Sequence, residues 1–194
     1  HGLAAAVSVL PALGAFYRGA AGNAPLPALV TELNSLLCGL LPRGRFVAAA
    51  VVRLEAGSRN GKIWVGGVPD VLRIGDDGRV LQRFVSRQLP LGILPSSEAG
   101  IVPEAFSWNE PSQIVLCSDG LTEAENSAGE AFGVKGLERT LQSTPRASRV
   151  AGLRQALTAH LGRQPAGDDV SVLIIDCAMD GGGNVAKPGE GGKP

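Results

Sequence analysis

Apolar residues recur at helical spacing through the first forty positions of the chain. Residues 2–19 are rich in Ala and Leu and run up to Gly19. After Pro25 and Pro27, residues 27–41 place leucines three and four positions apart: Leu29, Leu33, Leu36, Leu37 and Leu40. This period is typical of an amphipathic helix, and Pro is favoured in a helix's first turn. The pattern predicts two packed helices at the start of the chain.

The pattern changes at Phe46, where short runs of β-favouring residues begin. Four runs follow one another: Phe46–Leu54, Lys62–Val68, Val71–Ile74 and Val80–Val85. Turn-forming stretches at 58–61 and 75–78 separate them, which predicts antiparallel hairpins. Two more strands are expected at Ala105–Trp108 and Gln113–Ser118, with a turn between them at Glu110–Pro111.

Helical spacing returns after Gly120. Two helices are predicted at Val134–Gln142 and Ser148–His160, the second capped by Ser148 and ended by Gly162. A strongly apolar run, Val170–Cys177, then predicts a last strand. The predicted order of elements indicates an α+β layered domain rather than a doubly wound parallel sheet: two helices, a meander of strands, two more helices and a returning strand.

The length and composition predict one folded domain over residues 1–177. The chain has 194 residues, 44% of them apolar, which is enough to bury a full core. Residues 178–194 contain six glycines and two prolines, so we expect a linker or a disordered tail there. Ser8 and Pro11 interrupt the apolar start well short of the roughly 20 residues of a membrane span. Because the chain opens at His1 rather than Met, we expect it to be part of a longer protein.

Charge and cysteine content exclude several classes of function. Eighteen basic side chains balance eighteen acidic ones, so no net field draws the molecule to nucleic acid or to an anionic membrane. Cys38, Cys117 and Cys177 are odd in number and widely spaced, which argues against a disulfide framework and against a zinc site. Reduced thiols predict a cytoplasmic protein.

Two groups of acids are candidates for chemistry. Asp119 follows the apolar run 114–117 and is followed at once by Gly120, so a carboxylate is expected at a strand end where the backbone can approach closely. Oxygen ligands of this kind suit a hard divalent cation. Asp168 and Asp169 stand at the predicted start of the last strand, where neighbouring side chains point to opposite faces. We therefore expect Asp168 to share a site with Asp119; the alternative is that these acids only cap turns.

Other catalytic designs lack the residues that they need. A haloacid-dehalogenase site would place its nucleophilic carboxylate at position 117, which is Cys117. A phosphate-binding loop at 56–63 would have Ala56 in place of the first Gly and Ile63 in place of Ser or Thr. His160 falls in the last turn of a predicted helix, where an exposed capping role is expected. Carboxylates with a metal remain as the plausible chemistry.

Several short motifs occur in an order that matches one known family. They are His1–Ala6, Asn34–Leu37, Phe46–Ala49, Gly66–Pro69, Leu89–Gly92, Ser118–Ala124, Gly129–Gly133 and Asp168–Ser171. Taken together, they resemble the SpoIIE-type branch of the PPM (PP2C-like) serine/threonine phosphatases. The resemblance covers nearly the whole predicted domain.

The resemblance implies both a fold and a reaction. The fold is an αββα four-layer sandwich of two mainly antiparallel sheets flanked by helices. The site is a centre of two Mn²⁺ or Mg²⁺ ions, with Asp119 and Asp168 as catalytic metal-binding residues and with Asp169 and Gly2 as further ligands. A water activated by the metals attacks the phosphorus atom. The implied substrate is a phosphoserine or phosphothreonine on an anti-sigma-factor antagonist, in partner-switching signalling. An upstream receiver or sensor domain and a homodimer are further implied partners.

The chain departs from the family pattern at three places. The family's first metal-binding aspartate and its opening strands would precede His1, so we expect the N-terminal strands to be missing from this chain. Ala48 and Val68 stand where the family usually has polar residues. These departures keep an alternative open, in which the domain is a catalytically degenerate adaptor that binds a sigma factor or its regulator.

Overall fold

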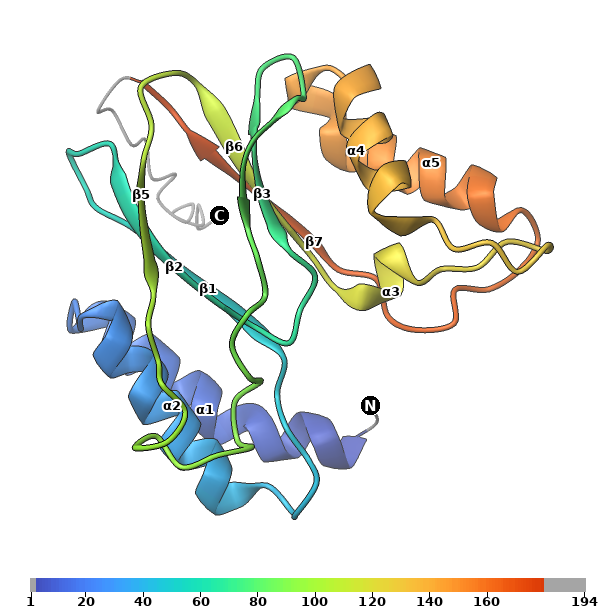
Figure 1. Ribbon diagram of the computed structural model, residues 1–194. Helices are drawn as coiled ribbons and strands as arrows, with labels where there is room; N and C mark the ends of the chain where they lie inside the picture. The colour runs from blue at the N-terminus through green and yellow to red at the C-terminus, as the bar shows by residue number, and fades with distance from the viewer. Residues whose placement is uncertain (1–2, 180–194) are drawn as a thin grey trace, which may run out of the picture.

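Two β-sheets are stacked between two layers of helix (Figure 1). The computed structural model describes residues 3–179. The first helical layer is made of α1 (Leu3–Ala21) and α2 (Leu26–Leu40). The first sheet contains β1 (Ala49–Leu54), β2 (Asn60–Gly66) and β5 (Glu104–Ser107). The second sheet contains β3 (Val71–Gly75), β4 (Val80–Phe84), β6 (Ser112–Cys117) and β7 (Val172–Cys177). The last layer holds α3 (Asp119–Thr122), α4 (Gly133–Ser143) and α5 (Arg149–Leu161).

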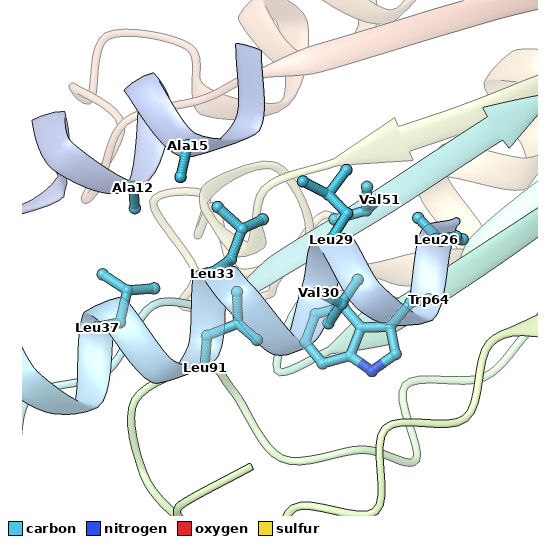
Figure 2. Packing of buried hydrophobic residues seen from close by; sticks show 10 residues of the cluster. All are labelled: Ala12, Ala15, Leu26, Leu29, Val30, Leu33, Leu37, Val51, Trp64 and Leu91. Carbon is cyan, nitrogen blue, oxygen red and sulfur yellow. The ribbon is translucent and has the colours of Figure 1, made fainter. Parts of the chain in front are cut away.

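The two opening helices pack on the first sheet through the predicted leucine stripe. Leu29, Leu33 and Leu37 of α2 are buried, and they form one cluster with Ala12 and Ala15 of α1 and Trp64 of β2 (Figure 2). The small side chains of α1 let the two helices approach closely. Helix α1 continues past Gly19, where the sequence suggested an end, and finishes at Ala21. A Cβ at Gly19 would lie only 2.6 Å from Cδ1 of Leu29. Gly19 therefore serves packing.

Within residues 3–179, every pairing between the seven strands is antiparallel. The strand order is β1-β2-β5 in one sheet and β4-β3-β6-β7 in the other. The predicted hairpins β1–β2 and β3–β4 are confirmed, with Gly78 at φ 77° in the second turn. The turn at Glu110–Pro111 does not close a hairpin, because β5 pairs with β2 while β6 pairs with β3 and β7. The chain crosses there from one sheet to the other.

In the described part of the chain, three hydrophobic cores lie between the four layers. Alternate residues of β2 serve different cores, since Trp64 faces the first helices while Ile63 and Val65 face the second sheet. On β6, Ile114 faces the first sheet and Val115 faces α4 and α5. A strand covered on both faces must be apolar throughout, which explains the continuous apolar runs. The predicted αββα sandwich is thereby confirmed.

Smaller expectations need correction. Ser148 lies at the N-cap of α5, but its side chain makes no capping hydrogen bond, because a 3-10 turn (Arg146–Ser148) leads into the helix. Strand β7 begins at Val172 rather than at Val170. No helix among residues 3–179 is both long enough and apolar enough to span a membrane. The predicted tail from 178 onward falls almost wholly outside the described residues and stays a prediction.

Candidate functional site

The candidate site forms where β6 ends and β7 begins. These two strands are antiparallel neighbours, with Cys117 opposite Val172. The residue after β6 therefore lies beside the residue before β7, and the backbone of Ser118 donates to the carbonyl of Ser171 at 3.0 Å. This pairing brings the segment of Asp119 next to the segment of Asp168 and Asp169.

The Ser118 side chain joins the two segments. Its hydroxyl donates to the carbonyl oxygen of Asp169 at 3.0 Å and accepts the backbone N–H of Ser171 at 2.9 Å. One hydroxyl thus holds both ends of the turn that precedes β7. Ser118 was expected only as part of a strand end and a motif, and this bridging role was not predicted. The sequence did contain a hint of this role, because the short polar side chain of a serine can form hydrogen bonds with nearby backbone groups.

Gly120 sets how closely the two segments approach each other. Gly120 is buried, and a Cβ built on it would lie 2.4 Å from the carbonyl oxygen of Asp169. The same Cβ would lie 3.3 Å from the carbonyl carbon of Asp168. The glycine was expected to allow a close backbone approach at the end of β6. What approaches it here is the loop that carries the second pair of acids.

The three carboxylates lie at the surface of this junction. Asp119, Asp168 and Asp169 are all exposed residues. One oxygen of Asp119 accepts the N–H of Gly120 at 2.9 Å, and one oxygen of Asp168 accepts the N–H of Asp169 at 2.7 Å. Among residues 3–179, none of the three forms an ion pair. Asp119 and Asp168 each use one oxygen locally and present an acidic edge to solvent.

The expectation that Asp168 and Asp169 start the last strand is wrong. Asp168 and Asp169 lie in the loop before β7 and not on the strand, because β7 begins only at Val172. Strand alternation therefore does not decide which of the two acids faces Asp119. Gly2, the remaining residue assigned to the metal, lies outside the described residues.

Cys117 is the buried residue that precedes the junction. Burial, reinforced by the negative charge of Asp119, raises the pKa of its thiol to about 11. The thiol therefore stays protonated at neutral pH and does not act as a nucleophile.

The carboxylate oxygens at the junction are suitable ligands for a hard divalent cation, but the described residues do not supply a complete set. Carboxylate oxygens with unused lone pairs are the ligands that Mg²⁺ and Mn²⁺ prefer. Within residues 3–179, however, no three His, Cys, Asp or Glu side chains are grouped closely enough to hold a metal ion. The described residues thus fit the cation in chemistry and supply part of a ligand set.

His160 has a role that the sequence did not suggest. It is half-buried rather than exposed, and its Nε2 lies 3.1 Å from the carbonyl oxygen of Ala124 and 3.0 Å from that of Glu130. Its ring also contacts Phe132 edge to face. Both partners of Nε2 are acceptors, so Nε2 carries a proton and donates. His160 ties the loop that follows α3 to the end of α5.

Comparison with known proteins gives a consistent result. A family model described as "Stage II sporulation protein E (SpoIIE)" matches residues 1–178. Comparison with curated proteins gave no match.

Three solved structures share the fold. The SiaA-PP2C domain of Pseudomonas aeruginosa superposes with a TM-score of 0.75 at 19% identity, over 90% of this chain and 70% of that one. The RsbU and RsbW domains of Rv1364c from Mycobacterium tuberculosis give 0.67 at 19% identity, over 90% and 49%. The PP2C phosphatase domain of SpoIIE from Bacillus subtilis, with a fragment of its regulatory domain, gives 0.74 at 14% identity, over 90% and 50%. This chain spans about half the length of the last two.

Proposed function

Because this chain belongs to the SpoIIE family of PP2C-like phosphatase domains, we propose that it is a metal-dependent phosphoserine/phosphothreonine protein phosphatase. The observation that carries the proposal is the junction of β6 and β7. There the backbone of Gly120 packs against Asp168 and Asp169, so acids far apart in the sequence share one edge of the sandwich.

We propose that Asp119 and Asp168 hold the metal, with Asp169 and the backbone of Gly2 as further ligands. Two structural neighbours support a divalent ion. RsbX was crystallised in complex with magnesium, and a phosphatase domain of SpoIIE from Bacillus subtilis was presoaked with Mn. Two Mn²⁺ or Mg²⁺ ions would supply Lewis acidity at the phosphoryl oxygens and a water of lowered pKa.

The chain's own residues would orient the ligands. The hydroxyl of Ser118 fixes the loop of Asp168 and Asp169, and Gly120 lets this loop lie against the end of β6. Local hydrogen bonds orient one oxygen of Asp119 and one of Asp168, which leaves the second oxygen of each to face a cation. The buried thiol of Cys117, whose pKa is raised, is not proposed as a nucleophile; the attacking group would be a metal-bound water.

The proposed substrate is a phosphorylated anti-sigma-factor antagonist. RsbU and RsbW domains occur together in the Rv1364c neighbour, and a regulatory domain accompanies the phosphatase domain of the SpoIIE neighbour. By analogy, an upstream receiver or sensor domain would control this domain, alone or as a homodimer. A cytoplasmic location is also part of the proposal, and the three free cysteines favour it.

A phosphatase assay on the full natural chain tests the function. We expect hydrolysis of a phosphoserine peptide and of p-nitrophenyl phosphate only with Mn²⁺ or Mg²⁺ present. Asp119→Asn should lower kcat/KM by more than about 100-fold, because it removes a charged ligand. Asp77→Asn is the matched control, since Asp77 is an exposed turn residue. Activity that persists in excess chelator would overturn the assignment.

Two departures from the family pattern favour a second candidate function, that of a non-catalytic adaptor. Ala48 and Val68 stand where the family usually has polar residues, which suits a degenerate adaptor that binds a sigma factor or its regulator. This alternative predicts that Asp119→Ala with Asp168→Ala leaves partner binding intact. Loss of partner binding in the folded double variant would argue against it.

A further inference from the structure

A cavity of about 490 Å³ lies beside the connection between α2 and β1. One wall is the turn that follows α2, and the other is the segment 92–95. The lining side chains include Cys38, Arg43, Arg45, Phe46 and Ile93. The residues from Pro42 to Phe46 are all exposed, so the cavity opens to solvent along this turn. The turn lies on the side of the sandwich away from α4 and α5 (Figure 1).

Both walls are held in place before any ligand binds. Asn34 is only 1% exposed; it accepts the N–H of Gly92 at 2.9 Å and donates to the carbonyl of Leu94 at 2.9 Å. Val47 and Leu91 exchange two backbone hydrogen bonds of 2.9 Å each. A ligand that enters the cavity therefore meets a pre-ordered surface, and little ordering free energy opposes binding.

The turn has a defined backbone at the two arginines. The N–H of Arg45 donates to the carbonyl of Pro42 at 3.0 Å, and Gly44 between the arginines has φ 80°. A positive φ at the third position of a turn favours Gly. Arg43 and Arg45 therefore belong to a turn of defined backbone geometry.

The cavity combines unpaired positive charge with exposed apolar surface. Neither Arg43 nor Arg45 forms an ion pair within residues 3–179, and no Asp or Glu lines the cavity. Phe46 is 56% exposed and Ile93 is 42% exposed. The site therefore offers two cations beside an apolar surface.

We propose that this cavity docks an acidic peptide segment of a protein partner, with carboxylates on Arg43 and Arg45 and an apolar side chain against Phe46 and Ile93. A lone phosphate ion would leave most of the volume and the apolar surface unused. Membrane recognition relies on clusters of about 4–8 basic residues, and only two lie here. The inference goes beyond the proposed phosphatase function and stands whether or not the chain hydrolyses phosphate.

Fluorescence anisotropy with a rhodamine-labelled peptide tests the proposal. The probe is Gly-Glu-Asp-Leu-Phe-Asp-Glu-Gly, and the control peptide replaces Glu with Gln and Asp with Asn. We expect the acidic probe to bind and the neutral peptide to bind at least about tenfold more weakly, with affinity falling as salt rises. Arg43→Glu with Arg45→Glu should weaken the acidic probe by at least about tenfold. Phe46→Ala should weaken both peptides.

Arg139→Glu with Arg154→Glu is the matched control. It makes the same change in net charge on two exposed arginines of α4 and α5 that form no ion pair among the described residues. Circular dichroism of each variant reports that it is folded. Equal weakening by both double variants, wild-type binding by the Arg43/Arg45 variant, or binding to phosphatidylglycerol vesicles but not to the acidic peptide would overturn the proposal.

Discussion

Gly120 is the residue on which the candidate site depends most directly. Its lack of a side chain lets the loop of Asp168 and Asp169 lie against the end of β6. The obstacle to any larger residue is the backbone of Asp169, which cannot turn aside as a flexible side chain can. A change at Gly120 should therefore displace the loop that carries the acids.

We expect Gly120→Ala to lower the free energy of unfolding by about 1–3 kcal/mol, the usual cost of overpacking. Urea denaturation measures this change. Gly39→Ala is the control, because a Cβ at Gly39 in α2 meets no atom within 4 Å. That control should gain about 0.5–1 kcal/mol from higher helix propensity. A Gly120→Ala protein as stable as wild type would contradict the packing described above.

At the scale of elements, α5 is fastened at both of its ends. His160 at its C-terminal end holds the carbonyl oxygens of Ala124 and Glu130. Arg146, in the turn before its N-terminal end, pairs with Asp176 of β7 at 2.7 Å and with Asp76 of the β3–β4 turn at 2.5 Å. The helix thereby connects the loop after α3 to the second sheet.

Replacing His160 should loosen the loop 124–132 without unfolding the protein. We expect His160→Leu to speed amide hydrogen exchange of Phe132 about five- to tenfold, as the loss of one hydrogen bond implies. The amide of Phe132 reports on this loop, because it donates to Ala124 at 2.8 Å. His160→Gln, which keeps a side-chain N–H donor, should exchange more slowly than His160→Leu. Equal exchange in wild type and His160→Leu would contradict this role.

The Arg146–Asp176 pair predicts a dependence on pH. Partial burial alone would raise the pKa of Asp176, but hydrogen bonds from Gln113 and Arg146 together with the arginine's charge hold it below its ordinary 3.8. A carboxyl with a depressed pKa contributes stability above pH 3.8 and loses it as the pH falls through the folded-state pKa. Asp176→Asn should therefore lower unfolding stability at pH 6 more than at pH 3, as urea denaturation at both pH values would measure. A constant difference would contradict the pairing.

At the scale of the whole molecule, the four layers could be predicted from the sequence. The spacing of apolar residues and the length of apolar runs depend on whether one or both faces of a helix or strand are covered by neighbouring layers. The leucines of α2 and the continuous apolar runs of β2 and β6 specified helix, strand and burial. Sheet membership could not be derived in the same way. The turn at Glu110–Pro111 is compatible either with a hairpin or with the observed crossing between sheets, and only long-range packing decides between them.

The candidate site could be predicted only in part for the same reason. Asp119 and Asp168 stood out because acids that border apolar runs are conspicuous. The contact that holds their segments together was not apparent, because the hydroxyl of Ser118 bonds backbone groups more than fifty residues away in the sequence. The bonds of His160 to the loop after α3 were missed for the same reason. Such hydrogen bonds produce no regular spacing of residue types that could be recognised in the sequence. The assignment of these acids to a metal therefore stays a prediction.

The central claim is that Asp119 and Asp168 bind a divalent metal ion. A titration with Mn²⁺ tests it most directly, with binding measured as the loss of the electron paramagnetic resonance signal of free Mn²⁺. The titration compares the full natural chain with Asp119→Asn, Asp168→Asn and the control Asp77→Asn. We predict that Asp119→Asn and Asp168→Asn each weaken Mn²⁺ binding by at least about tenfold, while the control binds as wild type does. Wild-type affinity for Mn²⁺ in both Asp119→Asn and Asp168→Asn would contradict the account.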